Sequence, residues 1–384
     1  MTDENKLITE RKKKLEAIKV NNKTYPNTFR KKDYAKNILV EYKDTDKEIL
    51  AEKNINVCIS GRLLTIRNMG NSSFANLHDE SGNVQIYLQK KQVGEDSYSL
   101  FNNLDLGDIV GIKGILFKTK TGELTVNTSS LTLLSKSLRP LPEKFHGIAD
   151  IEIKYRQRYL DLMINPDTKS LFKTRSKIVS SIRDFFINDD YLEVETPMMH
   201  MIPGGAAAKP FITHHNSLDL DLYLRIAPEL FLKRCIIGGF EKVFEINRSF
   251  RNEGLSVKHN PEFTMIEFYC AYQDYLYLMS LIEDLFSNVI NVLNLDTKFL
   301  YQEQDISFKT PFTRIKFYDA IAKYANDFDA SQLKDKSYIQ KYCSENGIGI
   351  SDKESLVKMH LGIFEKVVEK QLIDPTFVTH YPTE

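Results

Sequence analysis

The sequence of 384 residues contains no tryptophan, only four cysteines and no surplus of either charge. The cysteines are scattered without a CxxC pair, so neither a disulfide framework nor a zinc site is indicated and a reducing compartment fits. Lysine and arginine together number 52, as do aspartate and glutamate, so no global field marks the chain as a nucleic-acid binder. Any contact with RNA is therefore expected to come from local patches.

The sequence also lacks the loops and metal-binding motifs that mark several enzyme classes. No GxxxxGK[ST] loop is present, which excludes a P-loop nucleotide hydrolase, and no GxGxxG follows a strand-like run. HExxH and Cys/His clusters are missing, so a catalytic zinc ion is not expected. The first residues, MTDENKLITERKKK, have no apolar signal-sequence core, and no apolar run approaches membrane-spanning length. We expect a soluble, cytoplasmic protein with no membrane partner.

Hydrophobic periodicity divides the chain into four parts. Residues 1–53 are rich in lysine and asparagine and predict a helical N-terminal extension. Residues 54–137 alternate apolar and polar side chains in short runs separated by turns, which predicts a small β-barrel. Two prolines in residues 138–155 indicate a linker. Residues 156–384 mix strands and helices without a βαβ rhythm, which predicts an α+β domain with a largely antiparallel sheet.

One face of the expected barrel carries side chains that suit single-stranded nucleic acid. Phe74 alternates with Ala75 and Leu77, so its ring lies on the polar outer face, and Gln85 on the adjoining strand shares that face. An exposed ring beside an amide is suited to base stacking and edge recognition. A lone surface phenylalanine is a competing interpretation, and the residues alone leave both open.

The α+β part begins with a helix and leads to a hairpin. Apolar residues recur at helical spacing over 171–186, and a strand is expected over 191–196. The loop over 203–208, PGGAAA, allows the backbone to approach a ligand closely. A strand over 222–227 and a helix with Pro228 in its first turn come before the hairpin.

The returning strand of the hairpin has two different faces. One face holds Phe263, Met265, Glu267 and Tyr269, and the other holds Thr264, Ile266, Phe268 and Cys270. The second set is apolar enough for a core, whereas the carboxylate of Glu267 needs a cationic partner. That partner is either an internal lysine or arginine or the cation of a ligand. The planar guanidinium of Arg251 suits phosphate oxygens, and the ring of Phe263 offers a flat surface for stacking.

The segments FRNEG at 250–254 and HNPEFT at 259–264 resemble motif 2 of the class II tRNA synthetases. The helix over 171–186 with the strand that ends at Pro197 resembles motif 1, the dimer-forming element. The barrel resembles the five-stranded OB-fold anticodon-binding domain of the subclass that includes the aspartyl, asparaginyl and lysyl enzymes. The motifs PGGA at 203–206, RIAPE at 225–229 and EFY at 267–269 resemble the lysyl-tRNA synthetases of bacterial type.

This resemblance implies a lysine–tRNA ligase that works in two steps. The lysine carboxylate attacks the α-phosphorus of ATP to give lysyl-adenylate and pyrophosphate, and the 3′-terminal ribose of tRNA(Lys) then accepts the lysyl group. The implied ligands and partners are lysine, ATP, Mg²⁺, tRNA(Lys) and a second copy of the chain bound through motif 1. Because the attacking carboxylate is already ionised, alignment and charge neutralisation matter more than a general base.

The resemblance also assigns roles to individual residues. Arg251 is implied to clamp the α-phosphate and the substrate carboxylate, as the catalytic residue. The ATP site is assigned to Arg251, Glu253, His259, Asn260 and Phe263. The lysine site is assigned to Gly205, Glu229, Arg251, Glu267 and Tyr269. Reading of the anticodon is assigned to Arg62, Phe74, Gln85 and Glu123.

Members of this family continue beyond a point equivalent to Glu384, and there they carry motif 3 and Mg²⁺-binding glutamates. The only arginine after Arg251 is Arg314, so motif 3 is absent from residues 1–384. We therefore expect a catalytic domain that is incomplete at its C-terminal end, with metal-binding acids beyond residue 384 and with lysine activation by residues 1–384 alone close to abolished. A strand over 376–381 is expected to lack neighbours.

Three functions remain in competition at this point. The first is a lysine–tRNA ligase, and the second is a catalytically incomplete protein that only binds tRNA. The third is a paralogue that lysylates a translation factor, but such paralogues lack a barrel like the one expected over 54–137. Lysine-dependent exchange between ATP and pyrophosphate separates the first function from the second.

Overall fold

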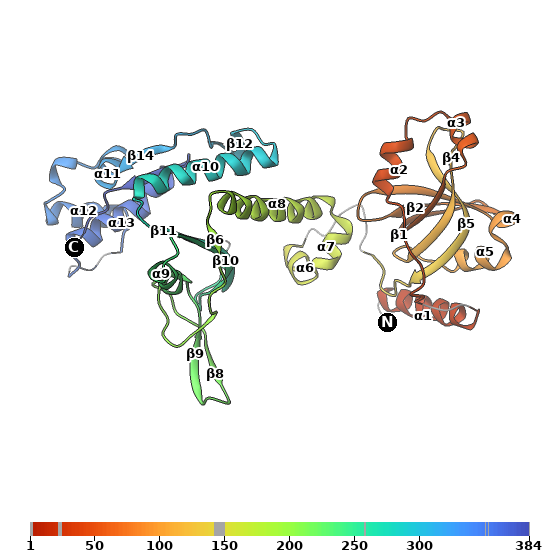
Figure 1. Ribbon diagram of the computed structural model, residues 1–384, viewed down its shortest axis with the longest axis horizontal. Coiled ribbons are helices and arrows are strands. Elements are labelled where there is room, and N and C mark those ends of the chain that lie inside the picture. Colours follow the sequence, from red (N-terminus) through yellow and green to blue (C-terminus); the bar gives the residue numbers. More distant parts are fainter. Residues whose placement is uncertain are drawn as a thin grey trace. The chain divides into compact units, whose positions relative to one another are not determined.

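The computed structural model describes residues 3–21, 25–141, 150–256, 259–349, 351 and 353–383. The chain divides after Pro166 into two compact units (Figure 1). We call residues 1–166 the barrel unit and residues 167–384 the α+β unit. Each unit has a hydrophobic core of its own.

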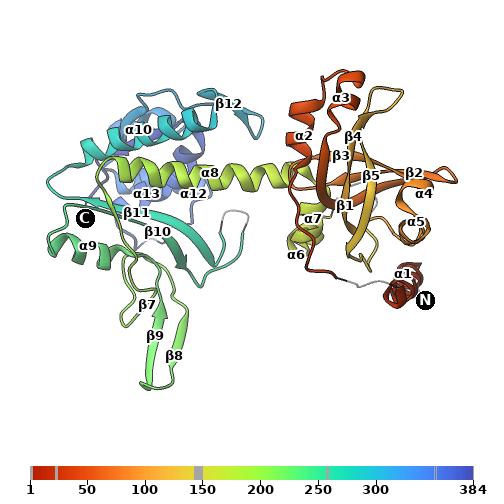
Figure 2. The same cartoon turned by 45° about the vertical axis from the view of Figure 1, so that its right-hand side comes forward.

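Five strands of the barrel unit close into a barrel in the order β1-β2-β3-β5-β4 (Figure 2). They are β1 (Asn56–Asn68), β2 (Ser72–His78), β3 (Asn83–Gln89), β4 (Ile109–Lys118) and β5 (Leu124–Ser135). Ala75, Leu77, Val84, Ile86 and Leu88 are buried and their neighbours in sequence are not, because successive strand side chains point to opposite faces. The expected five-stranded barrel is confirmed.

Seven helices accompany the barrel in the described part of this unit. They are α1 (Asp3–Asn21), α2 (Ala35–Tyr42), α3 (Lys47–Lys53), α4 (Lys90–Val93), α5 (Glu95–Asn102), α6 (Ile151–Arg156) and α7 (Arg158–Ile164). Ile18 of α1, Ile38 of α2, Leu50 of α3 and Phe101 of α5 join the core of the barrel. The helical pieces expected before the barrel are therefore present, and their apolar sides contribute to its core.

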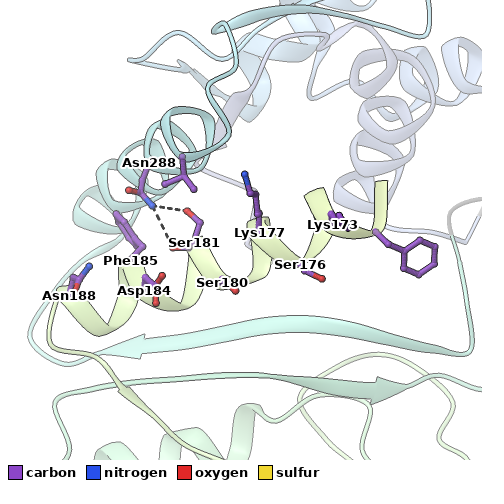
Figure 3. Close-up of a pocket in the computed structure, with 11 residues that line it drawn as sticks. Lys173, Ser176, Lys177, Ser180, Ser181, Asp184, Phe185, Asn188 and Asn288 are labelled. Atoms are coloured by element: carbon purple, nitrogen blue, oxygen red, sulfur yellow. Dashed lines mark hydrogen bonds between the residues drawn. The ribbon is translucent and has the colours of Figure 1, made fainter. Parts of the chain in front are cut away.

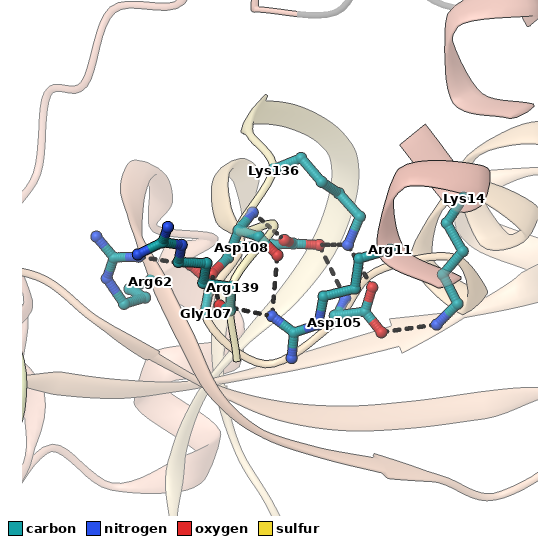
Figure 4. A network of polar contacts seen from close by, with 9 residues as sticks. Arg11, Lys14, Arg62, Asp105, Gly107, Asp108, Lys136 and Arg139 are labelled. Atoms are coloured by element: carbon teal, nitrogen blue, oxygen red, sulfur yellow. Dashed lines mark hydrogen bonds and ion pairs between the residues drawn. The ribbon is translucent and has the colours of Figure 1, made fainter. Parts of the chain in front are cut away.

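A buried polar network links α1 to the barrel where β4 begins and β5 ends (Figure 4). The side chain of Lys136 is fully buried, and its Nζ lies 2.7 Å from Asp108 Oδ2 and 2.5 Å from Asp105 Oδ2. Lys14 on α1 reaches Asp105 Oδ1 at 2.6 Å, and Arg11 donates to the Ser137 carbonyl at 2.9 Å. Burial acts to raise the pKa of Asp105, but the ammonium groups of Lys136 and Lys14 outweigh it, so the pKa of this carboxyl is lowered.

The α+β unit is built on a long helix and a small sheet. The helix α8 (Pro166–Asn188) covers the expected helical stretch. The sheet has the order β11-β10-β6, where β10 (Lys242–Phe250) pairs antiparallel with β11 (Glu262–Cys270) and parallel with β6 (Leu192–Glu193). Phe186 of α8 stacks on Phe244 at 5.2 Å between ring centroids and contacts Phe268 at 4.7 Å. This aromatic contact fixes the helix to one face of the sheet.

A second sheet and a helix lead into the hairpin. The sheet has the order β7-β9-β8, with β7 (Met199–His200), β8 (Ile212–His215) and β9 (Leu220–Leu224), and α9 (Glu229–Ile237) follows Pro228. The strand expected over 191–196 is shorter than predicted. Beyond Val194 the backbone leaves the ladder, because the Thr196 amide bonds the Glu245 carboxylate at 3.3 Å instead of a strand.

The remaining elements follow the hairpin. They are α10 (Tyr275–Leu293), β12 (Lys298–Tyr301), β13 (Gln304–Ser307), β14 (Thr313–Lys316), α11 (Phe317–Tyr324), α12 (Lys336–Glu345), α13 (Leu356–Ile363) and β15 (Thr376–Thr379), with short helical turns at Ala330–Gln332, Phe364–Val368 and Glu369–Gln371. The expectation that the last strand has no neighbour is wrong. β15 pairs in parallel with β14, and Phe377 packs on Phe312 at 5.9 Å between ring centroids.

The helix α10 departs from a further expectation. It is 19 residues long and apolar enough, by length and composition alone, to cross a membrane, although no apolar run of that length was expected from the sequence. The helix contributes Leu281 and Leu285 to the core beside Phe186 and Phe244. A core helix passes the same test as a membrane span, so this property is weak support for a membrane segment.

Candidate functional site

The β10–β11 pair separates core side chains from site side chains by strand alternation. Ile266, Phe268 and Cys270 pack against the core cluster around Phe186 and Phe244, as the alternation predicted. The opposite face carries Phe263, Met265, Glu267 and Tyr269, and none of these four belongs to that cluster. One strand therefore serves as a wall of the core on one side and as the floor of a candidate site on the other.

The acidic end of this floor lies against the start of α9. Tyr269 donates a hydrogen bond to Glu267 Oε1 at 2.7 Å, and Glu229 accepts one from Lys233 at 2.6 Å. Gly205 has a φ of +88°, and a Cβ added there would come within 2.9 Å of Glu229 Cβ. Only glycine fits this position without strain. The structure thus brings together four residues assigned to the lysine site, namely Gly205, Glu229, Glu267 and Tyr269.

Glu267 has no lysine or arginine in an ion pair among the residues that the structure describes. Burial raises the pKa of its carboxyl above the usual value, Glu229 and Glu245 raise it further by repulsion, and Tyr269 and Lys233 oppose the rise. Burial and the bond to Glu267 also raise the pKa of the Tyr269 phenol. Among the described residues Glu267 forms no internal salt bridge, so its half-buried carboxylate is available to an external cation.

The other end of the floor carries Arg251 and Phe263. The guanidinium of Arg251 lies over the Phe263 ring, 5.2 Å from its centroid, and its buried Nε has no hydrogen-bond partner among the described residues. A buried donor without a partner costs free energy, and a ligand oxygen that accepts from this guanidinium would remove that cost. Together the two side chains offer a cation and a flat apolar surface next to each other.

An open cavity of about 800 Å³ lies beside the loop that follows β10. It is lined by Ala206, Ala207, Ala208, Lys209, Asn252, Glu253 and Gly254. The Asn252 amide donates to the Lys209 carbonyl at 2.8 Å, so the alanine-rich loop and the loop after β10 are tied together at this cavity. Glu253, which was assigned to the ATP site, is exposed and belongs to this lining.

His259 and Asn260 lie in the exposed loop between the two strands. His259 Nδ1 is 2.7 Å from the Ser256 hydroxyl, and the Asn260 side chain donates to the Glu262 carbonyl at 2.8 Å. Neither residue lines the cavity. In this structure both side chains therefore bond within their own loop rather than toward Arg251.

The outer face of the barrel groups three of the four residues assigned to the anticodon. Phe74 lies 4.6 Å from Tyr87 between ring centroids, and Tyr87 lies 5.9 Å from Phe117. Gln85 stands opposite Asn76 and accepts from the Thr125 hydroxyl at 2.8 Å. Glu123 comes two residues before Thr125, whose hydroxyl contacts its carbonyl at 3.2 Å. The result is an aromatic strip with amide and carboxylate groups beside it.

Arg62 does not join this strip. Its guanidinium donates to the Gly107 carbonyl at 2.7 Å, beside the network of Asp108 and Lys136 (Figure 4). Burial lowers its pKa, and the charge of Asp108 opposes this change. The structure therefore places Arg62 with the polar network where β4 begins and β5 ends.

Sequence reasoning missed several residues that line or support these sites. Tyr87 and Phe117 extend the strip of Phe74, and period-two alternation with Gln85 could have identified Tyr87. Lys233 stands four residues after Glu229 on α9, a spacing that predicts their contact. The buried pair of Arg225 and Glu245 gave no local signal, because the two residues meet only through the fold.

Comparisons with known proteins agree with this geometry. The family model for class II tRNA synthetases (D, K and N) matches residues 150–384, and that for the OB-fold nucleic acid binding domain matches residues 57–134. The chain is 48% identical over 382 residues to a lysine–tRNA ligase of Nitrosomonas europaea and 50% identical to one of Thiobacillus denitrificans. Both alignments cover 100% of this chain and 76% of the relative. A lysine–tRNA ligase of Legionella pneumophila is 48% identical, with 77% of its length covered. The chain therefore belongs to the class II tRNA synthetases of the D, K and N group and, within that group, to the lysine–tRNA ligase family.

Proposed function

We propose that this protein activates lysine with ATP and transfers it to the 3′ end of tRNA(Lys). The observation that carries the proposal is the half-buried carboxylate of Glu267, which has no cationic partner among the described residues and lies beside Glu229 and Tyr269. An aspartate or asparagine side chain offers no cation to such a pocket, whereas the lysine ammonium does. The lysine–tRNA ligases among the relatives support the same substrate.

In the proposed mechanism the chain aligns two reactants that repel each other. Glu267 and Glu229 hold the side-chain ammonium of lysine, and the backbone of Gly205 lies against its main chain. Arg251 neutralises charge on the α-phosphate and on the lysine carboxylate, and its unpaired Nε is a donor for this purpose. Adenine stacks on Phe263. The attacking carboxylate is ionised at neutral pH, so catalysis comes from alignment and electrostatic stabilisation.

The rest of the ATP site is proposed for the loop around the cavity. Glu253 lines the cavity, and Asn260 and His259 are assigned to adenine and to the β- and γ-phosphates. For the last two this assignment requires the loop to change its hydrogen bonds when ATP binds. Magnesium is expected from the family, but the described residues contain no cluster of three His, Cys, Asp or Glu side chains that could hold it.

Replacement of Glu267 by glutamine is expected to weaken lysine binding by roughly ten- to a hundredfold, since one charge-assisted hydrogen bond is worth about 1.5–3 kcal/mol. ATP affinity should change much less, because the ATP groups are assigned to the other end of the floor. Calorimetric titration with each ligand measures both effects. Glu262→Gln is the matched control, since Glu262 is exposed on the same strand but on its opposite face. Equal losses for lysine and ATP would contradict the assignment.

The barrel is proposed to bind the anticodon of tRNA(Lys) through the strip of Phe74, Tyr87 and Phe117, with Gln85 and Glu123 at base edges. Arg62 was also assigned to the anticodon. Its guanidinium lies beside Gly107, so a contact between Arg62 and tRNA would be separate from the strip. The barrel also argues against the paralogue that lysylates a translation factor. The OB-fold match over residues 57–134 supports nucleic-acid binding.

Replacement of Phe74 by alanine is expected to weaken tRNA binding by about 1–3 kcal/mol through the loss of base stacking. Lysine binding without tRNA should be unchanged, because Phe74 belongs to the barrel unit, whereas Glu229 and Glu267 belong to the α+β unit. Filter binding with tRNA(Lys) and titration with lysine measure the two effects. A variant that unfolds would show that Phe74 acts as core beside Tyr87 instead.

A homodimer through α8 is proposed from the surface of this helix (Figure 3). A cavity of about 780 Å³ runs along α8 and α10, where Asn288 donates to the Ser181 hydroxyl at 3.0 Å. Leu171, Phe172 and Ile187 of α8 are exposed, and such exposed apolar side chains support burial of this helix by a second copy. Sedimentation velocity measures the oligomeric state directly.

We also propose a cytoplasmic location for the protein.

The proposed function is tested by lysine-dependent exchange between ATP and pyrophosphate, followed by lysylation of tRNA(Lys). We expect exchange with lysine and none with aspartate or asparagine. Binding of tRNA(Lys) without any exchange would favour the protein that only binds tRNA. Exchange driven by asparagine or aspartate would overturn the proposed substrate.

A further inference from the structure

A fully buried ion pair lies beside the group of Glu229, Glu267 and Tyr269, which we call the acidic pocket. Arg225 and Glu245 have side chains that are each 1% exposed, and Arg225 Nη1 lies 2.6 Å from Glu245 Oε1. The Thr196 hydroxyl donates to Glu245 Oε2 at 2.6 Å, and the Asn247 amide donates to Glu245 Oε1 at 3.2 Å. Such a pair is expensive to desolvate, and its energy alone does not explain why the fold contains it.

Arg225 joins three segments of the chain that border the pocket. Its Nε donates to the Arg248 carbonyl at 2.8 Å, and its backbone amide donates to the Met198 carbonyl at 2.8 Å. The Arg225 carbonyl accepts from the amide of Phe250 at 2.9 Å, immediately before Arg251. A single side chain and its peptide groups therefore hold the segment after β6, the end of β9 and the end of β10 in one arrangement.

Each residue of the pair is close to a residue of the pocket. Glu245 on β10 stands directly opposite Glu267 on β11, so the two side chains share a face of the sheet. Arg225 comes four residues before Glu229, in the segment that leads into α9. Lys233 is bonded to Glu229 and Arg225 to Glu245, so of these three carboxylates Glu267 is the one that has no ion pair with a described residue.

We propose that Arg225, Glu245 and Thr196 form a positioning cluster that aligns Glu229 and Glu267 and sets the charge of the pocket for a single ligand ammonium. This inference rests on the proposed use of lysine as substrate. The cluster has two effects. First, the cluster fixes the segments that carry the two acids. Second, the guanidinium of Arg225 neutralises Glu245, so Glu245 does not act on the ligand as a third negative charge.

The charge effect predicts opposite shifts for two single variants. Lysine binding requires an ionised Glu267 and is lost as pH falls through the pKa of that carboxyl in the free protein. Glu245→Gln removes a repulsive charge and leaves Arg225 unbalanced, so lysine binding should persist to a pH lower by about one unit. Arg225→Gln leaves Glu245 unbalanced, so the loss of binding should begin about one unit higher. The groups that face Glu267 are Tyr269 on its own strand, Glu245 on β10, and Glu229 and Lys233 at α9.

The experiment is calorimetric titration of the chain with L-lysine from pH 4 to 8, for the unmodified protein and for the two variants. Circular dichroism confirms the fold of each variant before titration. We call the pH below which lysine binding is lost the acid limit. The acid limits of the two variants are expected to move in opposite directions. A merely structural role would weaken binding without moving them in opposite directions. Displacements in the same direction, or none, would overturn the charge effect. If the unmodified chain binds no lysine, it is the proposed function that fails.

A double variant keeps the test decisive if the single variants do not fold. Arg225→Met with Glu245→Met replaces the pair by apolar side chains of similar length, a change that often preserves stability. The acid limit should then stay near that of the unmodified chain, while lysine affinity falls about tenfold because the charge-assisted hydrogen bonds that hold the segments are lost. Unchanged affinity in the folded double variant would overturn the positioning role.

Discussion

Replacement of Arg251 by glutamine is expected to slow lysine-dependent pyrophosphate exchange by about 10²–10³-fold, which is the usual loss for one preorganised charge-stabilising donor. The structure gives the reason. The guanidinium lies over the Phe263 ring, and its buried Nε has no hydrogen-bond partner in the part of the chain that the structure describes, so it retains a donor for oxygens of the substrates. Exchange rates at saturating lysine and ATP measure the effect on the chemical step.

Two comparisons sharpen this prediction. Arg248→Gln makes the same chemical change three residues earlier, on an exposed side chain of the opposite face of β10, and it should leave exchange within a fewfold of the unmodified rate. Arg251→Lys keeps the charge but loses the planar fork and should recover only part of the activity. If the two glutamine variants lose activity equally, Arg251 does not act on the substrates.

Replacement of Lys136 by methionine is expected to lower the free energy of unfolding of the barrel unit by about 3–5 kcal/mol, because two carboxylates lose their buried cation. The side chains of Lys136 and Asp108 are both fully buried, and Asp105 is 17% exposed. Hydrogen exchange at the amides of β4 and β5 reports the unfolding of this unit separately from the other. Lys113→Met is the matched control, since Lys113 is exposed on β4.

The effect of Lys136 should depend on pH in a defined direction. The pKa of Asp105 is lowered in the folded protein, so its ion pairs contribute their full stability above the ordinary value of 3.8 and lose it as pH falls through the lowered value. The difference in free energy of unfolding between the unmodified chain and Lys136→Met should therefore become smaller below about pH 4. A loss under about 1 kcal/mol at neutral pH would mean that the pair behaves like an exposed one.

The sequence predicted those features of the site that depend on local periodicity. Alternation along one strand was enough to put Glu267 and Tyr269 on one face and Phe268 on the other, and the core cluster confirms it. The barrel strands around Phe74 followed from the same rule. A period of two is a property of any strand, so it can be read before the partners of the strand are known.

What could not be predicted are the partners of charged groups. The sequence left open whether Glu267 pairs with an internal cation, and it gave no sign that Arg225 pairs with Glu245 twenty residues later. It also grouped Arg62 with Phe74, whereas the structure places Arg62 beside Gly107. These outcomes depend on which segments the fold brings together, and no local pattern records that.

The two-sided strand β11 has a consequence for how this protein tolerates mutation. In a saturation scan that scores cellular abundance and lysylation separately, positions 263–270 should fall into two interleaved classes. Substitutions at Ile266 and Phe268 should reduce abundance, because they disturb the core. Substitutions at Glu267 and Tyr269 should leave abundance near normal while lysylation fails. The fitness landscape along this strand should therefore repeat every two residues, with selection for folding and selection for substrate acting at alternate codons.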